Sequence, residues 1–149
     1  MGRRWRDGRG ELIVRGSGSG SNGRGNGRGR GRGSGGEDGG GGGAAGVRIP
    51  LEIATSYRAR TKGLLGRDSV TGALLLSPAS SVHTFRMRIP IDVAYLDRHL
   101  RVVAVRTMRP GRLGMPRPRA RHVLEAAAGA MDEWGLREGA RVEVVAVEG

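Results

Sequence analysis

Glycine is distributed very unevenly along this chain, and that distribution limits where a packed core can form. The 149 residues include 29 glycines, of which 20 lie in residues 1–46 and nine in residues 47–149. The stretch RGSGSGSNGRGNGRGRGRGSGG has no hydrophobic period, so it cannot bury enough apolar surface to offset the entropy of ordering it. We therefore expect residues 1–46 to form a disordered, low-complexity Gly/Ser/Arg tail and residues 47–149 to form a single domain.

Both segments are basic. The tail contains nine arginines against four acidic residues, and residues 47–149 contain 17 basic against ten acidic residues, which together give the net charge of +12. Such a surplus favours anionic partners, such as nucleic acid, phosphorylated ligands or acidic membrane surfaces. Only one of the 26 basic residues is a lysine, which is also what biased codon usage in a GC-rich genome produces. Composition leaves both explanations open.

Several classes of protein are excluded or not favoured. The chain has no cysteine, so disulfides, zinc–thiolate sites and cysteine nucleophiles are ruled out. It has neither the roughly 20-residue apolar run of a membrane-spanning helix nor the apolar core of a secretory signal, which predicts a cytoplasmic protein. Residues 47–149 contain no phosphate-binding glycine motif and no serine elbow. We therefore expect no cofactor, and the sequence does not favour an enzyme.

From Val47 onward, short apolar runs bounded by turn residues predict a β-rich domain. Pro50 lies inside the first run, and a proline, which has no N–H to donate, is typical of an edge strand. The frequent turns and the lack of repeated helical crossovers favour a small antiparallel β-sandwich or barrel-like domain. Seven strands are expected, in VRIPLEIA (47–54), GALLLS (72–77), SVHTFRMRIP (81–90), IDVAYLD (91–97), LRVVAVRT (100–107), RHVLEAAAG (121–129) and RVEVVAVE (141–148).

Two short helices interrupt these strands. In ATSYRARTKGLLG, Thr55 or Ser56 is a suitable N-cap and Gly63 can end the helix with a positive φ. In AAAGAMDEWGL, the corresponding stop is Gly135. The expected fold is therefore mainly β, with about seven strands and two short helices.

The stretch HTFRMRIPIDVAYLD, residues 83–97, raises the main functional question. Read as an extended chain, its alternation places the apolar residues from Phe85 to Tyr95 on one face and Arg86, Arg88 and Asp92 on the other. Burying Asp92 is costly unless its carboxylate is paired or hydrogen-bonded. In a structural interpretation, Asp92 accepts backbone N–H groups or an arginine beside Pro90. In a functional interpretation, Asp92 and Glu125 line a polar cleft with nearby arginines and bind a small anionic or sugar-like ligand.

The histidines give no clear metal site. His122 and Glu125 are three residues apart in an expected strand, so their side chains point to opposite faces, which argues against chelation. His83 alternates with apolar residues and is expected to be a core residue. His99 lies in an expected turn. No ligand spacing here matches a metal motif, and none is assigned.

The order of five motifs provides a resemblance to a known family. TSYRARTKGLLG, GALLL, HTFRMRIPIDVAYLD, VLEAAAG and GLREGARVEV together resemble domain of unknown function 192 over residues 47–149. The resemblance implies a compact, mainly β fold and supplies no established activity. Many members have an aromatic-Trp-Met run and then Lys-Asn-Thr before the proline, whereas FRMRIP here lacks both the Trp and the Asn. The family signature falls on Thr84, Met87, Pro90, Ile91 and Asp92, on Arg60, Gly63 and Leu64, and on Leu124 and Glu125.

Three classes of function follow from these residues. The leading one is a non-catalytic binding or accessory module that presents an arginine-rich site to an anionic or small polar ligand. The second is a nucleic-acid-binding protein that uses the tail and the basic loop 109–121. The third is a small hydrolase or metal-dependent enzyme centred on Asp92, His122 and Glu125, which requires these side chains to converge. The sequence does not indicate an oligomeric state. The candidate ligand-binding residues are Arg86, Arg88, Asp92, Glu125, Arg117 and Arg119, and the candidate nucleic-acid-binding residues are Arg24, Arg28, Arg30 and Arg32, with Arg112, Arg117, Arg119 and Arg121 of the loop.

Overall fold

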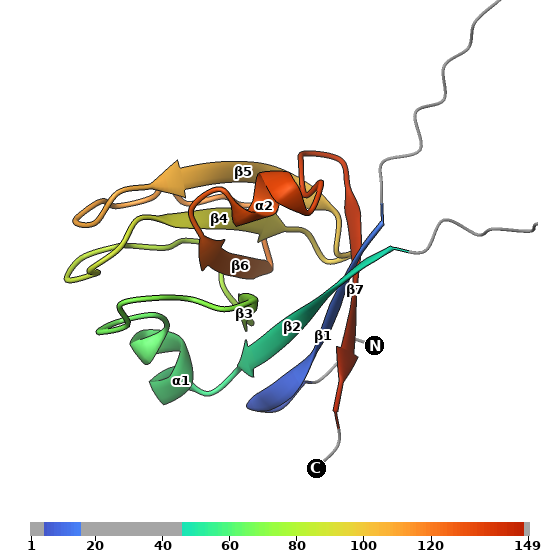
Figure 1. The fold of residues 1–149 in the computed structure, drawn as a ribbon, viewed down its shortest axis with the longest axis horizontal. Coiled ribbons are helices and arrows are strands. Elements are labelled where there is room, and N and C mark those ends of the chain that lie inside the picture. The colour runs from blue at the N-terminus through green and yellow to red at the C-terminus, as the bar shows by residue number, and fades with distance from the viewer. Residues whose placement is uncertain (1–4, 16–45, 148–149) are drawn as a thin grey trace, which may run out of the picture.

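The computed structural model describes residues 5–15 and 46–147, and these form a mainly β domain. This part of the chain contains seven strands and two short helices, and Figure 1 shows how they are arranged. The order along the chain is β1 (Gly8–Arg15), β2 (Val47–Ala54), α1 (Tyr57–Lys62), β3 (Ala73–Leu76), β4 (Ile91–Leu96), β5 (Val102–Met108), β6 (His122–Ala127), α2 (Ala130–Glu133) and β7 (Arg141–Ala146). Among the described residues, no helix is long and apolar enough to cross a membrane.

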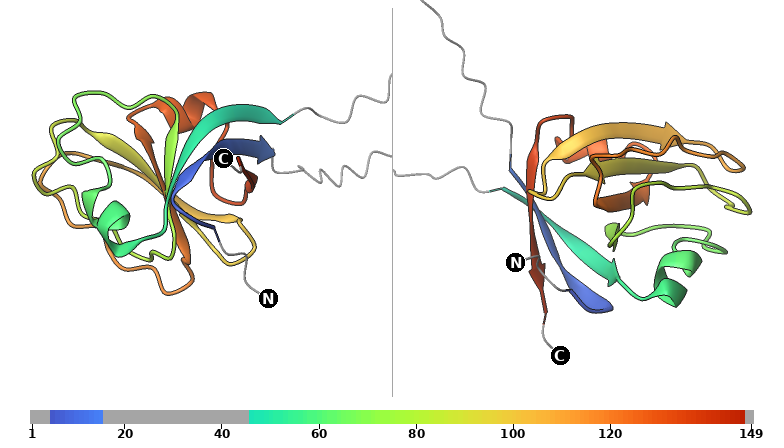
Figure 2. Two further views of the ribbon diagram at one scale, coloured as in Figure 1. Left: turned by 90° about the horizontal axis from the view of Figure 1, so that it is seen from below. Right: turned by 180° about the vertical axis from the view of Figure 1, so that it is seen from behind.

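The strands form one strongly curled sheet in the order β5-β4-β6-β3-β2-β1-β7. All neighbouring pairs are antiparallel except β2 and β3, which are parallel and are connected through α1. The two ends of the sheet meet where β5 and β7 begin, because Arg101 forms a bridge with Arg141 and the Val102 N–H donates to the Ala140 carbonyl at 2.8 Å. Both views in Figure 2 show the resulting half-barrel.

The central strands are buried on both faces. One cluster gathers side chains from strands at both ends of the sheet, including Leu12, Leu96 and Val142, and α2 contributes Met131. We call this side the inner face. The opposite, outer face carries a second cluster that includes Leu74, Val93 and other residues under α1 and the long loops. Because both faces are covered, all six residues of β4 are buried.

The first strand corrects the expected domain boundary. Residues 1–46 were expected to form a disordered tail, but Gly8–Arg15 lies in the sheet between β2 and β7. Leu12, Ile13 and Val14 are buried, and a three-residue apolar run is enough when two neighbouring strands supply its hydrogen bonds. Gly10 also permits close pairing, because a Cβ at this position would collide with the Val145 carbonyl. Residues 16–45, with Arg24, Arg28, Arg30 and Arg32, lie outside the described residues.

The expected strand at 81–90 is also wrong. In this segment only His83 forms a β-bridge, to Leu113. Arg86 adopts a positive φ of 61°, and the Met87 N–H donates to the Thr84 carbonyl at 3.2 Å, so a turn interrupts the alternation. His83 and Phe85 are exposed, whereas the alternation had predicted them on a buried face. The strand begins only at Ile91.

The remaining local predictions are confirmed, with one exception. Ser56 caps α1, its hydroxyl accepting from the Ala59 N–H at 3.1 Å, and Gly63 ends the helix with a φ of 45°. Gly135, just after α2, has a φ of 71°. The exception is that β2, which contains Pro50, is an interior strand and not an edge strand; its pairing with β3 begins only at Leu51, so Pro50 itself is paired on one side only, with Glu11 of β1.

Candidate functional site

Asp92 is a structural residue on the inner face. One carboxylate oxygen, Oδ1, accepts from the Thr107 hydroxyl at 2.7 Å, and the other, Oδ2, accepts from the backbone N–H groups of Gly129 and Met131 at 2.9 and 3.1 Å. Gly129 is the N-cap residue of α2 and has no side chain to cap the helix itself. Asp92 therefore supplies the missing cap from a neighbouring strand. This confirms the structural interpretation of the buried carboxylate through its backbone donors.

Glu125 lies on the opposite face of the sheet from Asp92. Asp92 pairs with Ala126, and Glu125 pairs with Val93, so the two acids are one position out of phase. Glu125 is 5% exposed, and this burial raises its pKa to about 7 despite the opposing effect of the Arg67 guanidinium. Arg67 is held by Glu52, with 2.8 Å between Nη2 and Oε2. The expectation that Asp92 and Glu125 line one cleft is therefore wrong.

His122 is the third residue of the expected enzyme site. It lies on the inner face with Asp92, but it pairs with Leu96 at the far end of β4. Its Nδ1 is 2.7 Å from the Ser77 hydroxyl, its ring packs against that of Trp5 in a T-shaped arrangement, and burial lowers its pKa. Asp92, His122 and Glu125 do not converge, which contradicts the hydrolase or metal-enzyme hypothesis. Within residues 5–15 and 46–147, no group of three or more His, Asp or Glu side chains could hold a metal ion.

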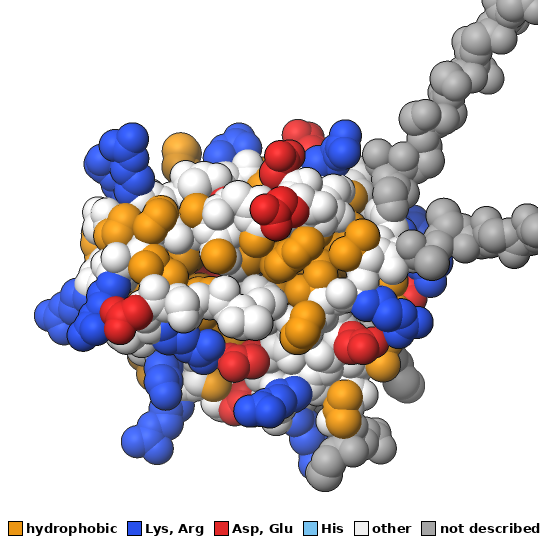
Figure 3. Space-filling model, in the orientation of Figure 1, with side chains coloured by type: hydrophobic (Ala, Val, Ile, Leu, Met, Phe, Trp, Pro, Cys, Tyr) orange, Lys and Arg blue, Asp and Glu red, His pale blue; other side chains and the backbone are white. Residues whose placement is uncertain are grey.

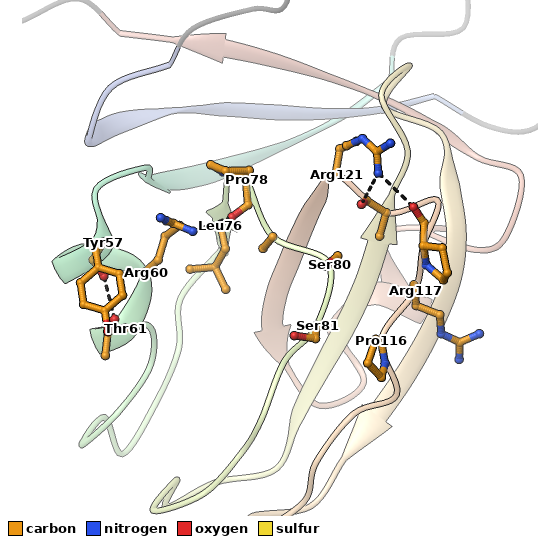
Figure 4. Close-up of a pocket in the computed structure, with 13 residues that line it drawn as sticks. Tyr57, Arg60, Thr61, Leu76, Pro78, Ser80, Ser81, Pro116, Arg117 and Arg121 are labelled. Atoms are coloured by element: carbon orange, nitrogen blue, oxygen red, sulfur yellow. Dashed lines mark hydrogen bonds between the residues drawn. The ribbon is translucent and has the colours of Figure 1, made fainter.

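A cleft lies between α1 and residues 116–121, with residues 78–81 between these two walls (Figure 4). Its volume is about 590 Å³. The lining residues are Tyr57, Arg60, Thr61, Leu76, Pro78, Ala79, Ser80, Ser81, Pro116, Arg117, Pro118, Ala120 and Arg121. We call this the arginine cleft, because it contains three arginines and no carboxylate.

Hydrogen bonds hold two of these arginines on opposite walls. Arg60 donates from Nη1 to the Pro78 carbonyl at 2.9 Å and from Nε to the Thr55 carbonyl at 3.2 Å. Arg121 donates from Nη1 to the Pro118 carbonyl at 2.9 Å. These bonds fix both side chains, and within the described part of the chain the Nη2 group of each forms no further hydrogen bond.

Arg117 is held differently. Its guanidinium carbon lies 5.4 Å from the centre of the Tyr95 ring, a cation–π arrangement. Burial raises the pKa of the Tyr95 hydroxyl, and the charge of Arg117 opposes that change. The Nε of Arg117 is buried, and none of the described residues accepts a hydrogen bond from it. A buried guanidinium N–H without a partner costs free energy.

Of the candidate ligand-binding residues, only Arg117 lines this cleft. Arg86, Arg88 and Arg119 are exposed on loops, and Arg88 pairs with Asp68 at 3.1 Å. The prediction missed Tyr57, Ser80 and Ser81 as lining residues. Arg60 belongs to the family signature and Arg121 to the basic loop, so a sequence signal existed for both. The two serines became relevant only through the loop geometry.

A second cleft, of about 760 Å³, lies next to the first and shares Pro78 and Arg121 with it. It contains Ser77, His122 and Trp5. The Ser77 backbone N–H donates to the Ala54 carbonyl at 3.0 Å, so it is not available to stabilise an oxyanion beside the hydroxyl. We interpret the Ser77–His122 contact as a cross-strand hydrogen bond that satisfies a half-buried histidine.

Solved structures show the same fold. A Sinorhizobium meliloti protein, described as a proposed transcription regulator, superposes with a TM-score of 0.65 at 14% identity, covering 95% of this chain and 98% of that one. A protein of unknown function from Novosphingobium aromaticivorans gives a TM-score of 0.58 at 20% identity, covering 68% of this chain and 79% of that one. These identities support the fold alone.

Sequence comparison identifies the family. A UPF0127 protein of Pyrococcus horikoshii is 34% identical over 84 residues, covering 53% of this chain and 73% of that protein. A UPF0127 protein of Pyrococcus abyssi is 32% identical over 99 residues, covering 63% and 80%. The family model DUF192, described as "Uncharacterized ACR", matches residues 41–144. The chain therefore belongs to the uncharacterised DUF192 family, as the order of its motifs predicted.

Proposed function

We propose that this protein is a non-catalytic binding module and that the arginine cleft holds a small anionic ligand. The observation that carries the proposal is that Arg60, Arg117 and Arg121 line one cleft whose lining residues include no carboxylate. An anionic oxygen in the cleft can accept charge-assisted hydrogen bonds from guanidinium groups, and these are stronger than neutral hydrogen bonds. A volume of about 590 Å³ lies within the range of small-molecule sites.

The lining supports a phosphate or carboxylate group attached to a hydroxyl-bearing body. Arg60 lies on the α1 wall and Arg121 on the 116–121 wall (Figure 4), and the carbonyl bonds at their Nη1 atoms leave each Nη2 without a partner among the described residues. Tyr57, Ser80 and Ser81 add hydroxyl groups that donate or accept. Because no carboxylate is among the lining residues, no negative charge there repels an anion.

Calorimetric titration with inorganic phosphate, glucose 6-phosphate and glucose tests this proposal. We expect both anions to bind, the sugar phosphate more tightly, and neutral glucose to bind at least about tenfold more weakly than glucose 6-phosphate, because a lost charge-assisted hydrogen bond costs roughly 1.5–3 kcal/mol.

Arg117→Met should weaken anion binding by about tenfold or more, since it removes one of the three guanidinium groups of the cleft and keeps an apolar stem on Tyr95. Arg119→Met is the matched control, because Arg119 is exposed and does not line the cleft. Equal losses in the two variants would show that only general positive charge is involved and would refute the proposal.

A further inference from the structure

The two long loops on the outer face form a small surface of their own, independent of the arginine cleft. His83 and Leu113 form an antiparallel bridge, flanked by hydrogen bonds from the Thr84 N–H to the Arg112 carbonyl at 2.7 Å and from the Gly114 N–H to the Val82 carbonyl at 2.8 Å. The Thr84 hydroxyl also donates to the Arg109 carbonyl at 2.6 Å. These bonds hold the loops together as a short ladder.

The ladder has a buried side and an exposed side, and the exposed side is apolar. Since paired residues point the same way and neighbours alternate, Val82 and Thr84 face inward and are buried. The outward positions are apolar: Phe85 is 48% exposed, Leu113 71% and Met115 75%. His83 stacks on Phe85, with 5.2 Å between ring centroids. We call His83, Phe85, Leu113 and Met115 the loop patch.

Around the patch, both loops are strongly basic. Residues 82–90 and 109–121 contain seven arginines and no acidic residue. Arg88 is paired with Asp68, and Arg117 and Arg121 line the arginine cleft. The arginines that remain for the loop patch are Arg86, Arg109, Arg112 and Arg119. Figure 1 shows the two loops projecting at the end of the molecule away from β7, and Figure 3 shows arginine and lysine side chains at the edge of that end. Exposed apolar tips surrounded by positive charge match the two layers of an anionic membrane surface.

We propose that the loop patch docks onto an anionic phospholipid bilayer, with Phe85, Leu113 and Met115 entering the headgroup region and the surrounding arginines binding lipid phosphates. The apolar side chains favour a bilayer over nucleic acid. Bases bind by stacking on aromatic faces, whereas two of the three tips are aliphatic and the Phe85 ring already stacks on His83.

Co-sedimentation of the full chain with vesicles tests the proposal. We expect binding to vesicles that mix phosphatidylglycerol with phosphatidylcholine, and at least tenfold weaker binding to pure phosphatidylcholine. Replacing Arg109 and Arg112 by serine should weaken binding by about fivefold per arginine, because each basic residue near an anionic surface contributes roughly that factor.

A second test distinguishes docking by the loop patch from electrostatic attraction of the Gly/Arg segment at residues 16–45. It removes the apolar side chains of the patch and leaves the arginines in place. Leu113→Ser combined with Met115→Ser should weaken binding to the mixed vesicles by about tenfold or more. Val145→Ser combined with Val147→Ser is the matched control, since these valines are 48% and 65% exposed at the β7 end; it should leave binding unchanged. Each double variant is checked for an unchanged melting temperature.

Three results would overturn the proposal. The first is an absence of binding to the mixed vesicles. The second is equal binding by the wild type and the Leu113/Met115 variant, together with loss when Arg24, Arg28, Arg30 and Arg32 are replaced by serine. The third is tighter binding of single-stranded DNA or RNA that depends on Phe85, which would make the loop patch a nucleic-acid site.

Discussion

Asp92 and Glu125 are both buried carboxyl groups in adjacent strands, yet the hydrogen-bond donors around them differ between the two faces of the sheet. On the inner face, Asp92 accepts hydrogen bonds from a hydroxyl and two backbone N–H groups. On the outer face, the hydrogen bonds found among the described residues include none to Glu125, and burial raises its pKa to about 7. The carboxylate of Asp92 therefore caps a helix on the inner face, whereas the carboxyl group of Glu125 on the outer face has a raised pKa.

A buried acidic side chain therefore does not by itself indicate a functional site. The donors around Asp92 compensate for its desolvation, so its carboxylate stabilises the fold. Glu125 has only the Arg67 guanidinium to oppose the cost of burial, and Arg67 is already paired with Glu52. The outer face, which carries Glu125, also carries the arginine cleft and the loop patch.

Asp92→Ala should cause the largest change in stability. It leaves the Gly129 and Met131 N–H groups and the Thr107 hydroxyl without their acceptor, and we expect a loss of about 3–4 kcal/mol in the free energy of unfolding. Asp92→Asn keeps an acceptor oxygen and should lose about 1–3 kcal/mol. Urea denaturation measures both values. Asp132→Ala, an exposed acid in α2, is the control and should change stability by less than about 0.5 kcal/mol. An unchanged midpoint for Asp92→Ala would refute the capping role.

Glu125→Gln should act in the opposite direction. The folded-state pKa of Glu125, about 7, lies above its ordinary value of 4.5, so the folded chain binds more protons than the unfolded chain between these pH values. The contribution of Glu125 to the free energy of unfolding is therefore fully present below about pH 4.5. It falls by roughly 3 kcal/mol in total as the pH rises through about 7.

The glutamine variant removes this pH-dependent loss. It should match the wild type near pH 4.5 and be more stable by about 2–3 kcal/mol at pH 8, measured by urea denaturation at both values. Glu133→Gln, at an exposed position in α2, should show no such pH-dependent difference. Destabilisation of Glu125→Gln at pH 8 would mean that the carboxylate has a partner that stabilises its charged form, as Asp92 has.

Replacing exposed loop arginines should have the smallest effect. Arg86→Ser and Arg119→Ser remove exposed side chains on the outer-face loops, and we expect each to change the melting temperature by less than about 2 °C. Thermal unfolding followed by circular dichroism provides the measurement. A large decrease would show that these loops contribute to the core and are not free to bind a partner.

Much of the fold could be predicted from local patterns. The runs at 47–54, 91–97 and 100–107 became β2, β4 and β5, and Ser56 and Gly63 bound α1 as expected. About seven strands were expected and seven are present among the described residues, but they are not the same seven: residues 81–90 form a loop, and Gly8–Arg15 forms a strand. Both errors arise from the same cause: alternation and composition describe a segment in isolation, whereas pairing depends on which backbone lies beside it.

The candidate sites show the same limit. Sequence alternation placed His122 and Glu125 on opposite faces, and this prediction is confirmed. It could not relate Asp92 to Glu125, since that requires the register between β4 and β6. Likewise, Arg117 was identified as a candidate, but its unpartnered Nε and its position opposite Arg60 depend on how loop 109–121 packs against residues 78–81.

The amino-acid sequence alone determined the β-rich class, the family and most element boundaries, because these depend on short-range periodicity, capping residues and the order of motifs. The tertiary structure decided which strands pair, which carboxyl group is satisfied and which arginines share a cleft. These properties depend on contacts between residues far apart in the chain, such as Asp92 with Met131 and Arg60 with Pro78, and no local pattern records such distances.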